Sequence, residues 1–202
     1  MKIINQITEN EMIGTFLQAE INSKRFQKYI NDYLTKKNLN KNLIERPNFK
    51  SAKENNLRYE ILDEYRGYGK RTELFENFPQ NLNWYEVELN KKEVQKVKYI
   101  NYDFWIELSN KTRRPKEAAK NIQNGKKVFN QPNNNFIEAA EKLEKGTIFP
   151  EMILVAKSEN DYLVALEGNL RLTAYALKPN YVPEKTKAIL GISKGISNWG
   201  LY

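Results

Sequence analysis

The residues best placed to do chemistry lie in the stretch 163–177, LVALEGNLRLTAYAL. Its first five residues are typical of a buried strand, and its last eight of a helix. The turn between them carries Glu167, Gly168 and Asn169, and Arg171 follows one step into the helix. A strand that ends in glycine and enters a helix presents free main-chain N–H groups, and these favour an anion. The pattern therefore indicates a phosphate site.

Each residue type in this stretch suits one task at such a site. Gly168 allows a sharp turn and a close approach of the ligand. Arg171 can bind a phosphate through two N–H groups, and Asn169 adds amide donors. Glu167 is placed to act as a catalytic base or to hold Mg²⁺ beside the phosphate. Thr173 is a further candidate for binding the phosphate, and its small side chain keeps that face of the helix narrow.

The same spacing has a purely structural alternative. In that alternative Asn169 is the N-cap of an ordinary helix, and Arg171 lies on the surface. Arg113 and Arg114, in the loop SNKTRRP, are further candidates for binding the phosphate. Their alternative is a solvated basic loop.

Composition narrows the chemistry further. The 202 residues include no Cys and no His, which excludes thiol nucleophiles, His bases, disulfides and the usual zinc sites. We expect no metal site built by the protein alone. Any acid–base catalysis must therefore use Asp, Glu, Lys or Tyr. The net charge of +8 permits nucleic acid or another polyanion as partner, although Lys- and Asn-rich composition can also reflect an AT-rich genome.

No apolar run is long enough to span a bilayer, and the start of the chain, MKIINQITENEM, lacks the apolar core of a signal peptide. We therefore expect a soluble, cytoplasmic protein without a membrane partner. The sequence makes no prediction about the oligomeric state.

The first part of the chain is predicted to be helical. Apolar and aromatic residues recur at helical spacing over 9–37, after a capping-box pattern of Thr8 and Glu11. A second helix-like region covers 57–78 and is broken at 66–71, RGYGKR. That break is either a Gly-capped helix end, the interpretation we favour, or a phosphate-binding loop.

The second part mixes strands and helices. Alternating or apolar runs predict strands at 84–89, 150–157, 162–166 and 186–191, the second and third joined by a hairpin turn. Helices are predicted over 116–124 and 136–145, the latter with Asn135 as its cap. The fold class is therefore α+β, with a helical N-terminal region at 1–80 and an α+β domain at 81–202.

The segment EGNLRLTA, at 167–174, resembles the G-x-x-R-x-x-A box of the ParB-like and sulfiredoxin-like superfamily. Gly168, Arg171 and Ala174 fall on that pattern. A helix that ends at Gly146, followed by FPEMILV, resembles the segments that precede the box. The similarity covers about 84–191, and it is closest to a group of uncharacterised bacterial proteins with a Glu-Gly-x-x-Arg-x-Thr-Ala-Tyr-Ala core.

This resemblance implies a small mixed sheet with flanking helices and a nucleotide phosphate at the box, with ATP or CTP and Mg²⁺ as candidate cofactors. Two departures limit what it implies. Sulfiredoxins carry a catalytic Cys after the glycine, where this chain has Asn169, so that chemistry is excluded. Partition proteins have Glu-Arg at the two positions taken here by Asn169 and Leu170, which puts their CTP switch in doubt.

Three functions remain open from the sequence. The first is a nucleotide-binding protein with phosphotransferase or NTP hydrolase activity. The second is a non-specific DNA-binding accessory protein that uses basic segments at 111–114 and 126–127, with Tyr and Trp stacking on single strands. The third is a protein-interaction module of a mobile-element or defence system, with the aromatic stripe of 9–37 as its interface.

Overall fold

The computed structural model describes all 202 residues. Contacts divide them into a helical unit, residues 7–80, and a sheet unit, residues 1–6 and 81–202. The sequence places the first six residues with the helices, whereas the structure places them in the sheet. No helix of either unit combines the length and the apolar character needed to cross a membrane.

The helical unit contains four α-helices and one 3₁₀ turn: α1 (Glu9–Glu20), α2 (Gln27–Lys36), α3 (Asn42–Glu45), α4 (Ala52–Arg66) and η1 (Glu73–Phe75). The predicted capping box is confirmed, since the Thr8 side chain accepts from the Glu11 main chain while the Glu11 carboxylate accepts from the Thr8 main chain. The helical pattern over 9–37, which predicts one helix or two, forms two helices separated by the turn at 21–26.

The aromatic stripe of 9–37 is largely internal to this unit. Phe16 is buried against Phe75, with ring centroids 6.1 Å apart, and Tyr33 is buried with its hydroxyl donating to Glu60. Among the aromatic residues of the stripe, Tyr29 is the well-exposed one, at 62%. The stripe is thus explained by packing, and it offers little apolar surface to a partner.

The break at 66–71 is a helix C-terminus, as favoured from the sequence. Gly67 follows α4 with φ of 71°, and its N–H donates to the carbonyl of Asp63. A Cβ at Gly67 would lie 2.6 Å from the main-chain oxygen of Thr72, which is far too close. The position therefore requires glycine for its left-handed backbone and for space.

The sheet unit is built on a mixed six-stranded sheet in the order β1-β2-β6-β4-β5-β3. Its strands are β1 (Lys2–Ile7), β2 (Asn83–Leu89), β3 (Lys98–Tyr99), β4 (Met152–Ala156), β5 (Val164–Glu167) and β6 (Thr186–Ile192). β6 is parallel to β4 and antiparallel to β2; β5 is antiparallel to β4 and parallel to β3. The four strands predicted from the sequence all form. β1 was not predicted, because its alternation is weak and it lies at the sheet edge.

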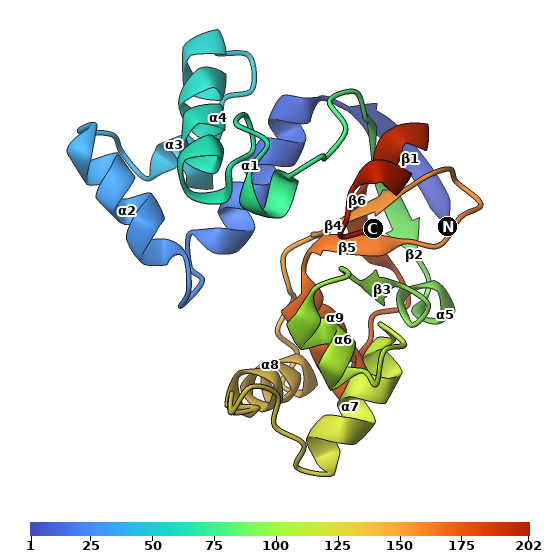
Figure 1. The fold of residues 1–202 in the computed structure, drawn as a ribbon. Helices are drawn as coiled ribbons and strands as arrows, with labels where there is room; N and C mark the ends of the chain where they lie inside the picture. The colour runs from blue at the N-terminus through green and yellow to red at the C-terminus, as the bar shows by residue number, and fades with distance from the viewer. The chain divides into compact units, whose positions relative to one another are not determined.

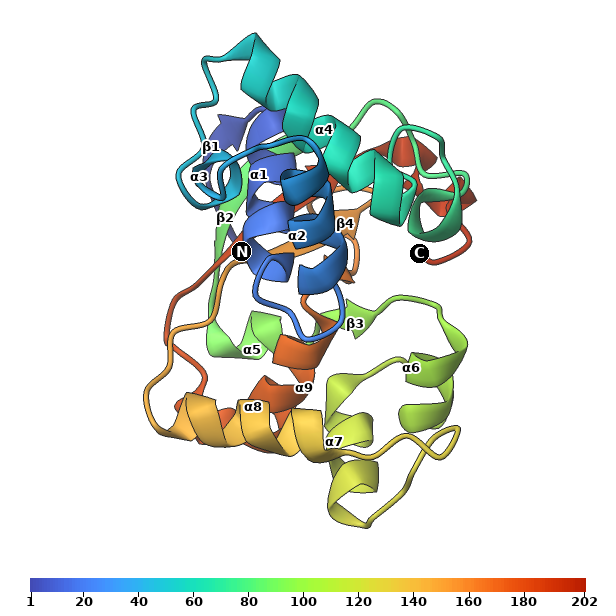
Figure 2. The ribbon, with the colours of Figure 1, turned by 90° about the vertical axis from the view of Figure 1, so that its left-hand side faces the viewer.

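The helices of this unit are α5 (Lys91–Val94), α6 (Asp103–Leu108), α7 (Pro115–Gln123), α8 (Asn134–Glu144) and α9 (Asn169–Leu177), with 3₁₀ turns η2 (Pro179–Tyr181) and η3 (Lys194–Asn198). Figure 1 shows α6, α7, α8 and α9 gathered on one side of the sheet, and Figure 2 shows α9 between the sheet and α8. Apolar residues of β2, β4, β5 and β6 pack there against α7, α8 and α9 as one core. The predicted α+β class is confirmed.

One predicted cap is wrong. Asn135 does not precede its helix, because α8 already begins at Asn134 with Asn133 as N-cap, and no side chain caps it. The side chain of Asn133 instead donates to the carbonyl of Lys126 and fastens the preceding loop. Asn at consecutive positions made the helix start ambiguous by one or two residues.

We expect Gly67→Ala to destabilise the helical unit by about 2–3 kcal/mol, because it adds a steric clash to the cost of a left-handed alanine. Gly125→Ala is the matched comparison, since Gly125 also has a positive φ, 77°, but a Cβ there meets nothing within 4 Å. That change should cost only about 1 kcal/mol. Urea unfolding followed by circular dichroism measures both, and equal losses would contradict the steric argument.

Candidate functional site

The turn at 167–169 follows strand β5 and lies beside the end of the parallel strand β3. β3 and β5 run in the same direction, with Lys98 opposite Val164 and Tyr99 opposite Ala165. Their carboxyl ends therefore meet at one edge of the sheet, where α9 begins. In open sheets this edge is a favoured place for ligands. The first N–H groups of α9 have no partners within the helix, as at any helix N-terminus.

Gly168 is the N-cap of α9 and has φ of 107°. A Cβ at this position would lie 2.7 Å from Cγ of Met152 and 3.2 Å from Nη2 of Arg171. The sharp turn predicted at Gly168 is therefore present, and the glycine leaves room for the strand beside it.

Arg171 is almost fully buried, and its guanidinium binds other groups of the protein. Its guanidinium forms an ion pair with the Glu167 carboxylate one turn earlier, the two side chains being 8% and 17% exposed. Nη1 also donates to the carbonyls of Pro150, at 2.7 Å, and Glu151, at 3.0 Å. The alternative of a surface Arg171 is wrong, and the guanidinium predicted to bind phosphate already has a carboxylate and two carbonyls as partners.

Asn169 is the first residue of α9 and does not cap it. Its amide donates to the carbonyl of Ala165 at 3.2 Å and its oxygen accepts from the N–H of Ile100 at 3.4 Å. Thr173 is buried and donates to the carbonyl of Asn169 at 2.9 Å. Its hydroxyl also shares a 2.7 Å hydrogen bond with the hydroxyl of Tyr99. Both side chains therefore tie α9 to β3 and β5.

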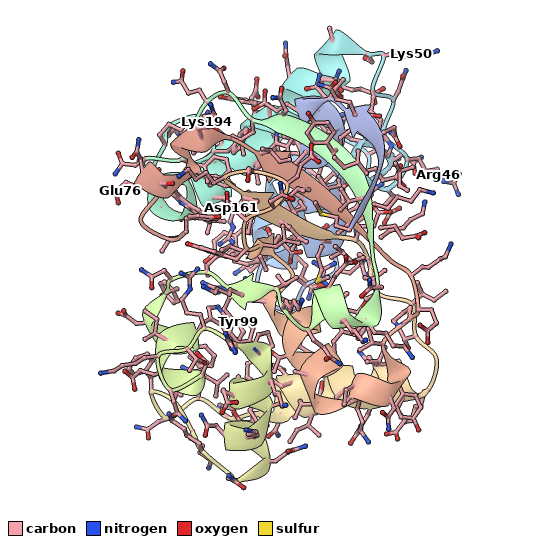
Figure 3. The ribbon with its side chains drawn as sticks, turned by 90° about the vertical axis from the view of Figure 1, so that its right-hand side faces the viewer. Arg46, Lys50, Glu76, Tyr99, Asp161 and Lys194 are labelled. Carbon is pink, nitrogen blue, oxygen red and sulfur yellow. The ribbon has the colours of Figure 1, made fainter.

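Tyr99 shows how closely β3 is joined to this turn. In Figure 3 it is labelled at the β3 ribbon, on the side where α6 and α9 lie. Its ring stacks on Trp105 at 4.5 Å between centroids, and burial raises the pKa of its hydroxyl. A neutral buried hydroxyl keeps the hydrogen bond to Thr173 over the physiological pH range.

Arg113 and Arg114 have separate environments. Arg113 donates from Nε to the carbonyl of Tyr99 at 2.8 Å and from Nη1 to the main-chain oxygen of Tyr202 at 2.6 Å. Burial lowers the pKa of its guanidinium. Arg114 precedes α7 and its side chain is exposed. Arg113 therefore fastens the segment at 201–202 to β3, and Arg114 is the freer cation of the two.

The turn can hold an anion through main-chain N–H groups, beside the half-exposed side chain of Leu170, at 39%. The residues present do not fit a magnesium site held by the protein. The Glu167 carboxylate is paired with Arg171, and no group of three or more Asp or Glu side chains is arranged so that it could hold a metal ion. Glu167 is likewise poorly placed as a base, because its carboxylate is committed to the ion pair.

A second cluster of interest was not predicted from the sequence. The ammonium of Lys98 lies 3.8 Å from the ring centroid of Tyr162, and that ring stacks on Tyr202 at 4.8 Å with 14° between planes. Burial, together with Arg113 and Arg114, lowers the pKa of Lys98. A lysine and two tyrosines from three distant segments leave no recognisable spacing in the sequence, so only the fold could reveal this cluster.

Comparison with known protein families, with curated proteins and with solved structures finds no similar protein.

We expect Arg171→Met to destabilise the sheet unit by about 3 kcal/mol, because it leaves the Glu167 carboxylate buried without its partner. The double variant Glu167→Gln/Arg171→Met should recover part of that loss, since no charge then remains buried. Thermal and urea unfolding of the two single variants and the double variant give the coupling energy. Strict additivity would contradict the structural role assigned to the pair.

Proposed function

We propose that this protein binds the phosphate of a nucleotide, such as ATP or CTP, at the start of α9, as a member of the ParB-like and sulfiredoxin-like superfamily. The observation that carries the proposal is the strand–Gly168–helix turn at the joined carboxyl ends of β3 and β5. The G-x-x-R-x-x-A spacing at 168–174 supports it, as does the mixed sheet with helices on one side.

The geometry favours particular roles for the residues of the box. The phosphate is held by main-chain N–H groups of the first turn of α9, which the helix dipole makes attractive to an anion. Arg171 is a positioning residue, since its pair with Glu167 and its bonds to Pro150 and Glu151 keep the turn in place. Because Glu167 is committed to that pair, binding is better supported than phosphotransfer or hydrolysis.

The test is a thermal-shift and calorimetric titration with ATP, CTP and GTP, with and without Mg²⁺, on the wild type and Leu170→Glu. A nucleotide at about a hundred times its Kd should stabilise the wild type by roughly 2.7 kcal/mol. Leu170→Glu places a carboxylate beside the phosphate and should abolish this stabilisation. The same carboxylate suits a helix N-terminus, so folding should be preserved.

Leu170→Gln is the matched control, because it has nearly the same size and polarity without the charge. It should retain the stabilisation by nucleotide. No stabilisation of the wild type by any of the three nucleotides would refute the proposal. Equal binding by the Glu and Gln variants would place the phosphate elsewhere.

Binding of single-stranded nucleic acid is a second candidate, favoured by one arrangement. Lys98, Tyr162 and Tyr202 form the cation–aromatic cluster described above, beside exposed Arg114. The two basic segments noted in the sequence lie next to each other: the Lys126 ammonium donates to the side chain of Asn110 at 3.0 Å, beside the 111–114 loop. Cations that follow a phosphate backbone next to aromatic rings are typical of single-strand binding.

Fluorescence anisotropy with labelled oligothymidine over a salt series tests this candidate. We expect Lys98→Ala/Arg114→Ala to reduce the salt slope by about two in total, and Tyr162→Leu to weaken only single-strand binding, by about 1–3 kcal/mol. Lys92→Ala, at an exposed lysine of α5, is the control and should change little. Equal affinity for a duplex of the same length would argue against stacking.

A further inference from the structure

The sheet unit contains a pocket of about 550 Å³ on the side of α9. It is lined mainly by the loop 146–151, which leads into β4, and by residues of the stretch 181–187, which leads into β6, together with Glu88 of β2, Leu143 of α8 and Tyr175 of α9. Its apolar lining is formed by Leu143, Ile148, Phe149, Pro150, Tyr175 and Tyr181. None of these residues belongs to the predicted phosphate site, so this pocket is a separate feature of the molecule.

Three aromatic rings line this pocket. Phe149 and Tyr175 have centroids 5.7 Å apart and planes tilted by 57°, so their faces are not stacked on each other. The Tyr181 ring lines the pocket as well and is about half exposed. Ring faces carry negative potential and attract organic cations, and several non-parallel rings around one space are the usual arrangement for binding quaternary ammonium groups.

Polar groups without partners lie among these rings. Thr186 is 6% exposed, and its hydroxyl oxygen is buried without a hydrogen bond. Tyr175 is 5% exposed, and burial raises its pKa. Its hydroxyl has no hydrogen-bond partner in the chain and keeps some contact with solvent. A buried hydroxyl left unpaired is unfavourable, and native proteins seldom leave one so without a ligand or water. Both hydroxyls therefore lack a partner that a bound molecule could supply.

Among the charged groups around the pocket, one carboxylate has no ion-pair partner. Lys187 pairs with Glu86 at 2.9 Å, and Lys185 pairs with Glu88 at 3.5 Å. Glu151 lines the pocket without an ion-pair partner. Burial and the nearby Glu86 raise the pKa of its carboxyl, while Lys187 opposes that shift. A cationic ligand would supply the missing counter-charge.

The pocket wall is also held rigidly. The carbonyls of Pro150 and Glu151 both accept hydrogen bonds from Nη1 of Arg171, which is itself fixed by Glu167. The main chain beside the Glu151 carboxylate is therefore fixed before any ligand arrives. Such preorganisation lowers the entropy lost on binding.

The geometry points to a binding site for a small organic ammonium ion that also carries a hydroxyl or carbonyl group. The ammonium lies against Phe149, Tyr175 and Tyr181, with Glu151 as its counter-ion. The oxygen of the ligand pairs with the hydroxyls of Tyr175 and Thr186. This site does not depend on phosphate binding at the start of α9.

Choline is the probe, and its uncharged isostere 3,3-dimethylbutan-1-ol is the first control. In an NMR titration of the full chain we expect saturable shifts with choline and none with the isostere. Glu151→Gln should weaken choline binding about tenfold or more, because it removes the counter-charge. It should not lower Tm, since it removes a half-buried charge that lacks a partner. Glu159→Gln, in the exposed β4–β5 turn, is the matched control and should bind choline normally.

Tetramethylammonium tests the role of the hydroxyls, because it lacks the oxygen of choline. We expect choline to bind more tightly than tetramethylammonium to the wild type. The preference should be smaller for Thr186→Val, which removes one of the two hydroxyls and leaves that of Tyr175. Equal binding of choline and its neutral isostere, unchanged affinity in Glu151→Gln, or no saturable shifts with choline would each overturn the proposal.

Discussion

The buried ion pair of Glu167 and Arg171 is the interaction on which the rest of the sheet unit depends. A guanidinium can be buried only if a carboxylate neutralises it and its N–H groups find acceptors. Glu167 provides the charge, and the carbonyls of Pro150 and Glu151 provide the acceptors. Through one side chain the end of β5, the first turn of α9 and the start of β4 are held together. Lysine could not do this, because its single ammonium lacks the planar fork of donors.

This pair decides what the neighbouring surfaces can bind. Since the positive charge of Arg171 is balanced internally, an anion at the start of α9 must be held mainly by main-chain N–H groups. Because Arg171 bonds to the carbonyl of Glu151 and leaves its carboxylate alone, that carboxylate stays available to the pocket beside Tyr175. One arginine thus connects the turn proposed to bind an anion with the wall of the pocket proposed to bind a cation.

Local patterns predicted much of the fold. The capping box at Thr8, the glycine cap at Gly67 and the strands around 84–89, 150–157, 162–166 and 186–191 each have a cause within a few residues, so they could be recognised without the fold. Helix starts marked by Asn were less certain. Asn135 was predicted as an N-cap, and Asn169 was one only in the structural alternative. Asn135 in fact lies inside its helix, and Asn169 bonds across to Ala165 and Ile100.

The sequence by itself determined the α+β class, the turn at Gly168 and the absence of His and Cys chemistry, because these follow from composition and short-range spacing. The tertiary structure alone decided the role of Arg171, the pairing of β1 with the sheet and the pocket formed by Phe149, Glu151, Tyr175 and Thr186. The reason is physical. Whether a guanidinium meets a phosphate or a carboxylate, and whether a hydroxyl is paired or free, depends on residues that the chain brings together from distant segments.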